Sequence, residues 1–265
     1  MKRITFLLLI SFLSQYLFAS DSLLCIKSIP IKGHLFSTDP IGNIYVVQSN
    51  NSLIRYNEKG DSTGIFNDIK KGKITQIDAT NPLRLLLFFT DYQQIIILDN
   101  LLSQKAILRF ANMGIIRVPC IAGSADGNIW MYDPTAGNLI KINDKQNILF
   151  TSSVRNVLPN PIDPIFMVEQ DRTLFVVDTI AGVKKFDSYG FYNTTFPIHT
   201  KQVQYVNDYL LYYHAPYLYS YNLRSTLEKK MDLPEPDDIL QVRMERNKVF
   251  ILRKKSLDIY LYSTQ

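Results

Sequence analysis

Short apolar runs recur along this chain with a period of about 40 residues. Each period contains an apolar run, a turn rich in Asn, Asp or Gly, a second run, a polar turn, and a third run that ends in Asn or Asp. Aliphatic and aromatic runs broken by such turn residues are typical of β-strands. The third runs end, at successive spacings of 42, 44, 44 and 35 residues, at Asn57, Asp99, Asn143, Asp187 and Asn222.

This repeat predicts an all-β fold, because no stretch after residue 19 sustains a helical period. Five or six units with four short strands each are typical of a β-propeller. We therefore expect residues 20–265 to form a six-bladed β-propeller with four-stranded blades. Five or seven blades are the alternatives, since counting blades from one sequence is error-prone.

The two ends of the predicted ring complement each other. The last unit supplies three runs, and the segment "LLCIKSI" at 23–29 can supply the missing fourth strand. We expect Leu24, Ile26 and Ile29 to pair beside the final strand near Ile259 and Leu261. Such a ring, closed by its mature N-terminal strand pairing with the last blade, has no free sheet edge at the junction.

Three units resemble NHL-type repeats, in which a strand ends in Asp, a short Gly/Asn turn follows, and the next strand ends in Asp before Gly. They are "NIYVVQSNNSLIRYNEKG" (43–60), "GNIWMYDPTAGNLIKIND" (127–144) and "TLFVVDTIAGVKKFDSYG" (173–190). The resemblance covers about half of the chain and implies a six-bladed propeller. Its motifs are structural, so it implies no particular activity.

In each of five successive units, the second run ends in a polar residue: Gln48, Asp91, Asp133, Asp178 and His214. A carboxylate at such a place can accept the backbone N–H groups of the following turn. A residue that repeats around a ring is usually part of the architecture. We therefore interpret Asp178 as a turn cap, with ligand binding as the alternative.

Residues 1–19 have the composition of a secretory signal peptide, with Lys2 and Arg3 before an apolar stretch and small residues near Ala19. We therefore expect a secreted protein, in the periplasm or on the outer cell surface, with a retained anchor as the alternative. Cleavage lowers the formal net charge from +5 to +3. The two cysteines, Cys25 and Cys120, form no disulfide framework and are expected to be buried.

The mildly basic charge does not indicate a nucleic-acid partner. The run "RKK" at 253–255, with Arg243, Arg246 and Lys248 nearby, is interpreted as a solvated edge. No membrane-spanning segment is expected after the signal peptide.

Function in a propeller is expected on the face that carries the inter-blade loops and the turns after the second strands, around the central channel. All three histidines, His34 included, map to this face. The candidate residues for docking a ligand or partner are Arg117, Asp133, Arg155, Asp178, His199 and His214.

The sequence carries no local enzyme motif of the kinds that bind nucleotides, hold zinc or place a nucleophilic serine. We expect a monomeric ring that binds an envelope or extracellular protein or ligand without catalysis, with no catalytic residue, metal or cofactor. One alternative is a metal-dependent hydrolase similar to the propeller lactonases, with histidines or aspartates holding a cation at the channel mouth. Another is a structural subunit of an envelope assembly that makes its contacts through the blade edges.

Overall fold

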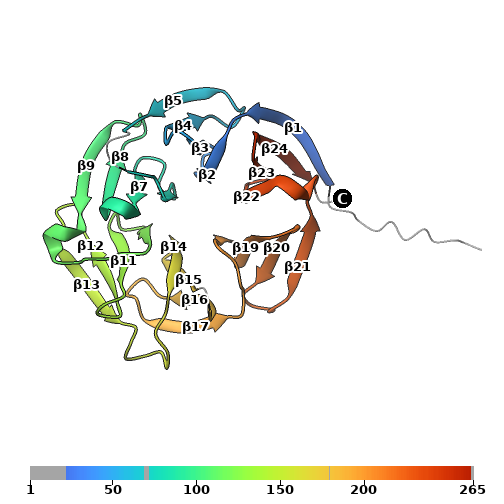
Figure 1. Cartoon of the computed structure of the whole chain (residues 1–265). Helices are drawn as coiled ribbons and strands as arrows, with labels where there is room; N and C mark the ends of the chain where they lie inside the picture. The colour runs from blue at the N-terminus through green and yellow to red at the C-terminus, as the bar shows by residue number, and fades with distance from the viewer. Residues whose placement is uncertain (1–21, 69–71, 179, 264–265) are drawn as a thin grey trace, which may run out of the picture.

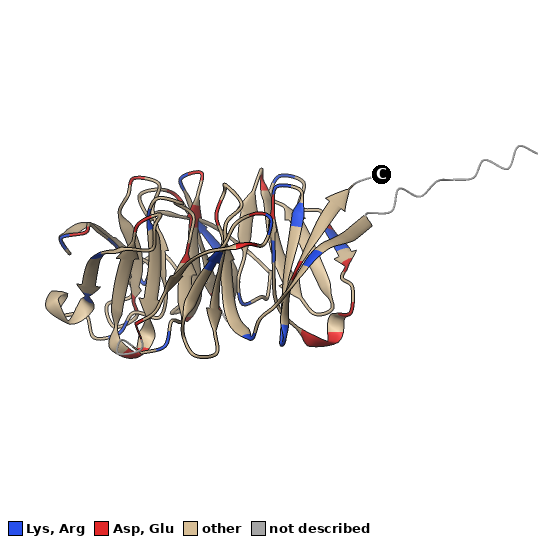
Figure 2. Ribbon diagram, turned by 90° about the horizontal axis from the view of Figure 1, so that it is seen from above, with Lys and Arg blue, Asp and Glu red and all other residues tan. Residues whose placement is uncertain are grey.

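The computed structural model describes residues 22–68, 72–178 and 180–263. They form six antiparallel four-stranded sheets arranged as blades around a ring (Figure 1). Seen from its edge, the ring is a flat disc whose strands run between two faces (Figure 2). The six-bladed propeller expected from the repeat is therefore confirmed. The expected signal peptide, residues 1–19, lies outside the described residues.

Strands succeed one another from the centre of the ring outwards in blades 1 to 3. The strands of these blades are β2 (Gly33–Thr38), β3 (Ile44–Gln48), β4 (Leu53–Tyr56) and β5 (Ser62–Phe66); β6 (Gln76–Asp78), β7 (Leu85–Phe89), β8 (Gln94–Leu98) and β9 (Gln104–Arg109); and β10 (Ile121–Gly123), β11 (Ile129–Asp133), β12 (Asn138–Ile142) and β13 (Ile148–Ser153).

Blades 4 and 5 repeat this order, and blade 6 combines both ends of the chain. Their strands are β14 (Pro164–Gln170), β15 (Thr173–Asp178), β16 (Gly182–Phe186) and β17 (Tyr192–Phe196); β18 (Gln204–Val206), β19 (Tyr209–His214), β20 (Tyr217–Asn222) and β21 (Glu228–Asp232); and β22 (Ile239–Glu245), β23 (Lys248–Arg253), β24 (Ser256–Ser263) and β1 (Ser22–Pro30). Within the described residues, three short 3-10 helices lie in loops: η2 (Thr90–Tyr92), η3 (Phe110–Met113) and η4 (Pro236–Asp238).

Strand β1 closes the ring by pairing antiparallel with β24. Leu24 pairs with Leu261, and Ile29 pairs with Leu257. Ile26 falls at a bulge between Cys25 and Lys27 and has no pairing partner in this ladder. The closure expected from the sequence is therefore confirmed, with one irregularity in register.

The two cysteines differ in burial. Cys120 lies in the core between blades 3 and 4, and burial raises the pKa of its thiol well above the usual range. Cys25 is exposed on β1, the outermost strand of blade 6. The expectation of two buried cysteines is therefore wrong for Cys25, because an outermost strand has no further blade strand to cover it.

The hydrophobic core is divided among the six junctions between blades. Each cluster of buried side chains draws on two neighbouring blades, as with Phe36 and Val46 of blade 1 packed against Phe250 and Leu252 of blade 6. A blade therefore buries its apolar faces only against its neighbours. The stability of each blade depends on a complete ring.

Glutamine side chains join the innermost strands of adjacent blades. The Gln241 amide accepts a hydrogen bond from the Phe36 N–H at 3.0 Å and donates one to the Phe36 carbonyl at 2.8 Å. Gln204 makes the same pair of bonds with Met244, and Gln76 makes it with Ile121. Each amide thus satisfies two backbone groups of the next blade that would otherwise be buried without partners.

The Asn and Asp residues that mark the repeat cap the turns between the third and fourth strands. The Asp187 Oδ1 accepts the N–H groups of Tyr189 and Phe191, both at 2.9 Å. The side chains of Asn57, Asp99 and Asn143 accept the N–H groups two and four residues further on in the same way. The periodic signal in the sequence is therefore a signal of turn chemistry.

Antiparallel pairing places alternate turns at opposite faces of the ring. The inter-blade face carries the loops between blades, including 110–120, 154–163, 197–203 and 233–238, and the turns between second and third strands. The turn face carries the remaining turns. None of the described helices is long and apolar enough to cross a membrane.

Removal of β1 tests the closure. A chain that begins at Lys32 loses the buried side chains of Ile29 and Ile31 and leaves one edge of β24 free. Deleting one buried isoleucine costs about 2–5 kcal/mol, and free strand edges promote association. We expect a lower melting temperature and self-association, measured by circular dichroism and by light scattering after size exclusion. The control is Leu24→Ser, an exposed position on β1; a monomeric shortened chain with unchanged melting would contradict the closure.

Candidate functional site

A cavity of about 770 Å³ opens on the inter-blade face between blades 5, 6 and 1. Its walls are residues 199–204 and 211–215 of blade 5, residues 239–243 at the start of blade 6, and His34 and Leu35 of β2. Cavities of about 300–1,000 Å³ are typical of sites that bind small molecules. This cavity is therefore the first candidate for a binding site.

All three histidines of the chain line this one cavity. His34 is the second residue of β2, His199 lies in the loop 197–203, and His214 is the last residue of β19. The sequence predicts all three on this face. The structure brings them together because the start of β22 forms the wall between blades 5 and 1.

Arg243 is a charged group on the cavity wall. It lies on β22, and its Nε donates a hydrogen bond to the Thr38 Oγ1 at 3.1 Å. Burial lowers the pKa of Arg243 to about 10, against the opposing effect of the Glu245 and Asp78 carboxylates. The guanidinium therefore still carries its positive charge at neutral pH.

Gln241 ties the cavity wall to the loop of blade 5. Besides its bonds to Phe36, its Nε2 donates to the Gln202 Oε1 at 2.8 Å. One amide thus connects β22, β2 and the loop 197–203. These three parts of the wall are held in place before any ligand binds, which lowers the entropic cost of binding.

His34 is half-buried, with its Nε2 at 3.4 Å from the Ile74 carbonyl. Burial lowers the pKa of His34, and the nearby Lys73 lowers it further. The ring is therefore neutral at pH 7, when histidine in water is already mostly uncharged. His34 adds a hydrogen-bonding group to the cavity rather than a charge.

The histidines do not form a metal centre. Among the residues that the structure describes, no group of three or more His, Cys, Asp or Glu side chains lies where it could hold a metal ion. Within the described part of the chain, no such group lies at the channel mouth, where the hydrolase alternative places its cation.

The six candidate residues fall into two groups on the inter-blade face. His199 and His214 line the cavity. Arg117 and Arg155 are exposed in the loops 110–120 and 154–163, on the blade 2 to blade 4 side of the ring, and neither lines the cavity. Asp133 and Asp178 end β11 and β15 on that same side.

Asp133 and Asp178 cap turns, the role that the sequence favours for Asp178. Asp133 Oδ1 accepts the Thr135 N–H at 2.9 Å. Asp178 accepts the N–H groups of Ile180, Ala181 and Asp163. Its other predicted equivalents vary, since Gln48 and His214 end their strands whereas Asp91 lies in η2.

Asp178→Asn tests the turn-capping role. Burial alone would raise the pKa of Asp178, but the backbone N–H groups of Ala181, Asp163 and Ile180 outweigh it and lower the pKa. The stabilisation is therefore present above the unfolded-state pKa of about 4 and is lost as pH falls through the folded-state value. We expect the variant to lose about 1–3 kcal/mol at pH 7, because its amide places a donor against an N–H group.

Urea unfolding of wild type and Asp178→Asn at pH 7 and pH 3 measures this difference. We expect the gap between the two proteins to narrow at pH 3. Equal free energies of unfolding at pH 7 would show that the carboxylate is not needed for the turn.

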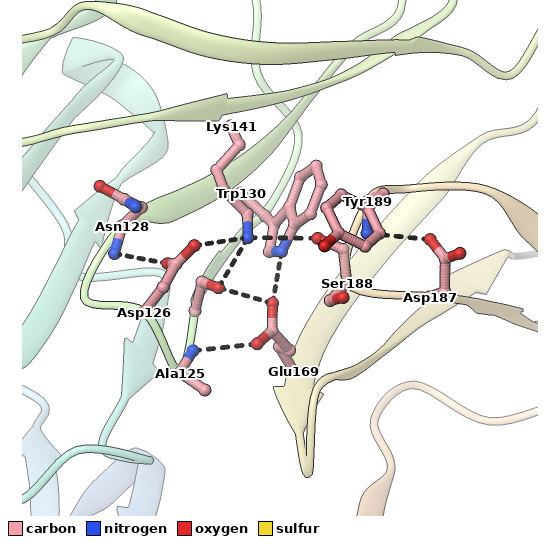
Figure 3. A network of polar contacts seen from close by, with 10 residues as sticks. Ala125, Asp126, Asn128, Trp130, Lys141, Glu169, Asp187, Ser188 and Tyr189 are labelled. Carbon is pink, nitrogen blue, oxygen red and sulfur yellow. Dashed lines mark hydrogen bonds and ion pairs between the residues drawn. The ribbon is translucent and has the colours of Figure 1, made fainter.

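A polar network on the turn face joins blades 3 and 4 (Figure 3). Glu169 of β14 accepts hydrogen bonds from the Ser124 hydroxyl, the Ala125 N–H and the Trp130 indole N–H. Lys141 of β12 donates to Ser124, to Asp126 and to the Ser188 carbonyl. Its ammonium also lies 4.5 Å from the centre of the Trp130 ring.

Such a network could belong to a catalytic site, in which a serine acts as the nucleophile and a neighbouring side chain acts as its base. Ser124 lies within hydrogen-bond reach of two possible bases, Lys141 and Glu169. Lys141, however, donates three hydrogen bonds, one of them to a carboxylate, so its ammonium has no lone pair to take a proton. Burial would raise the pKa of Asp126, but the hydrogen bonds from Lys141, Asn128 and Ser124 lower it to about 2. The arrangement fits a latch between blades.

Glu169→Gln tests this latch. The amide nitrogen of the variant would face at least one N–H or O–H donor, so that a buried group loses its partner. We expect a loss of about 1–3 kcal/mol in the free energy of unfolding, measured in urea. Asp171→Asn, an exposed carboxylate two residues away, is the control. An unchanged free energy for Glu169→Gln would show that the latch does not contribute to stability.

Sequence reasoning missed the charged and polar wall of the cavity. The interpretation of the basic residues as a solvated edge is wrong for Arg253, and Arg243 lies on the innermost strand β22 and lines the cavity. Arg253 is only 3% exposed and forms ion pairs with Asp258 and Asp238. The available signal was the alternation "QVRME" at 241–245, which places Gln241 and Arg243 on one side of an innermost strand.

The sequence matches no known protein-family model and no curated protein. Solved structures do show a similar fold. The chain superposes on a virginiamycin B lyase from Staphylococcus aureus in complex with quinupristin, in a catalytically inactive form, with 10% identity, a TM-score of 0.61, and coverage of 91% of this chain and 99% of that one.

Two other solved structures share the fold. The Cps50 (Swd1) β-propeller domain of Myceliophteria thermophila has 10% identity and a TM-score of 0.63, with 91% of this chain and 100% of that one covered. PorZ, a bacterial surface component of the type-IX secretion system of Porphyromonas gingivalis, has 12% identity and a TM-score of 0.54, with 92% and 39% covered. At such identities the likeness shows the propeller fold and nothing more specific.

Proposed function

We propose that this protein is a non-catalytic binding module that docks a protein or extracellular ligand on its inter-blade face. The observation that carries the proposal is the cavity of about 770 Å³, whose walls come from three blades and are joined by the Gln241 amide. A site built on rigid strands needs little ordering on binding.

The opposite side of the same face supports docking of a protein partner. Ile116, Val157 and Ile180 are exposed there by 86%, 56% and 81%. Ile116 directly precedes the exposed Arg117, and Val157 follows the exposed Arg155 by two residues. Ile180 lies in the turn between β15 and β16, on the same side of the face. Exposed aliphatic side chains mixed with arginine are typical of surfaces that bind proteins.

The proposed location is outside the cytoplasm, in the periplasm or on the outer surface. The composition of residues 1–19 supports it. The similarity to the surface component PorZ is compatible with an envelope partner. We also propose that this chain is related to the NHL-type propellers, because three of its units resemble NHL-type repeats.

Affinity capture with crosslinking in the native envelope tests the docking role. The tagged protein is compared with the double variant Arg117→Glu, Arg155→Glu, which reverses two charges on the inter-blade face. We expect the wild type to capture a partner and the variant to lose it, because reversed charge at a contact opposes association.

The matched control is Lys59→Glu, Lys145→Glu, which makes the same change of charge at exposed turns of the turn face. It should retain the partner. Retention by both double variants would exclude the Arg117 and Arg155 side of the inter-blade face, and would leave the cavity side or the blade edges, the latter as the structural-subunit alternative requires. Capture of no partner by the wild type would overturn the docking of a protein.

A further inference from the structure

The cavity between blades 5, 6 and 1 has a one-sided charge. Its charged lining residues are Lys201 and Arg243, and no Asp or Glu is among the described residues that line it. Two carboxylates act on Arg243 from outside the lining: Glu245, two residues further along β22, and Asp78, the last residue of β6. The wall facing a ligand is therefore cationic at neutral pH.

Arg243 has hydrogen-bonding capacity left for a ligand. Within the described part of the chain, the structure gives its guanidinium one hydrogen bond, from Nε to Thr38. The two terminal nitrogens, in their fixed planar arrangement, match the two oxygens of a carboxylate. Lys201 lies exposed in the loop 197–203 and lines the same cavity, so its ammonium adds a second positive charge to the lining.

The remainder of the lining is largely apolar. Leu35, Val203, Leu218 and Val242 are buried in the walls, and Leu240 is 43% exposed. Apolar surface of this kind stabilises a ligand by removing the ligand's own apolar area from water. A ligand that fits both parts of the lining has one anionic end and an apolar body.

We propose that this cavity binds a small organic carboxylate with an apolar body, its carboxylate held by Arg243 and Lys201. The volume suits a molecule of the size of a drug or metabolite. The inference rests on the proposed binding function and names the class of ligand for one part of that face.

The histidines supply a reporter that is specific to this cavity, because the chain has three and all of them line it. Their imidazole signals in heteronuclear NMR are followed while 4-phenylbutyrate is added to the purified protein. The matched probe is 4-phenyl-1-butanol, which keeps the apolar body and lacks the charge. We expect saturable shifts with the acid and binding at least about tenfold weaker with the alcohol, since hydrogen bonds to a charged group are lost.

Three variants locate the anion. Lys201→Gln removes an exposed charge and should weaken binding of the acid about threefold to tenfold. Arg243→Gln should weaken it by about tenfold or more, and Arg243→Lys should be intermediate because it keeps the charge without the planar pair of donors. Lys59→Gln on the turn face is the control and should bind as wild type does. Binding of the alcohol should be unchanged in all four.

Three results would overturn the inference. Histidine signals that do not move with the acid would show that the cavity takes no such ligand, and equal affinities for acid and alcohol would show that charge is not recognised. Unchanged affinity in both Lys201→Gln and Arg243→Gln would show that these two side chains do not hold the carboxylate. Partner capture through Arg117 and Arg155 is independent of these results, so the docking role and the ligand class can fail separately.

Discussion

Pairing of β1 with β24 is the constraint on which the rest of this ring depends. Each blade buries its apolar faces only against its neighbours, so an open ring would leave two blade faces and a strand edge in water. The junction of blades 6 and 1 is packed as the others are, with Phe36 against Phe250 and Leu252. The Gln241 amide then fixes the register of the two innermost strands through the backbone of Phe36. Closure, packing and register are thus joined at one place.

The two faces of the ring use their polar groups differently. On the turn face, Asp and Asn side chains such as Asp187 accept hydrogen bonds from the N–H groups of their own turns. Glu169 of blade 4 accepts hydrogen bonds from blade 3, and Lys141 of blade 3 donates one to blade 4. In the cavity that opens on the inter-blade face, Arg243 and Lys201 keep donors that the described residues do not use. Saturated groups hold a structure together, whereas groups with donors to spare can recognise a ligand. This difference is a reason for placing the proposed binding function on the inter-blade face.

The fold could be predicted from the sequence because its signals are local. Asn57, Asp99 and Asp187 each cap a turn within four residues, so their period is written directly along the chain. The cavity could not be predicted, since its walls come from β2, β19 and β22, which are far apart in sequence. Arg253 shows a second limit. A run of basic residues predicts that all of them are exposed to solvent. Lys254 and Lys255 do form an exposed turn, but Arg253 ends strand β23 and donates a hydrogen bond to Asp258.

The cavity lies beside the junction that closes the ring, and this position has a thermodynamic consequence. Gln241 lines the cavity and also holds blade 6 to blade 1, and Arg243 on the same strand bonds to Thr38 of blade 1. A ligand that contacts β2 and β22 together binds only where these strands are side by side. It therefore binds the closed ring in preference to an opened one, and stabilises closure by mass action. The proposed binding function therefore links occupancy of the cavity to integrity of the ring, since the same innermost strands provide both.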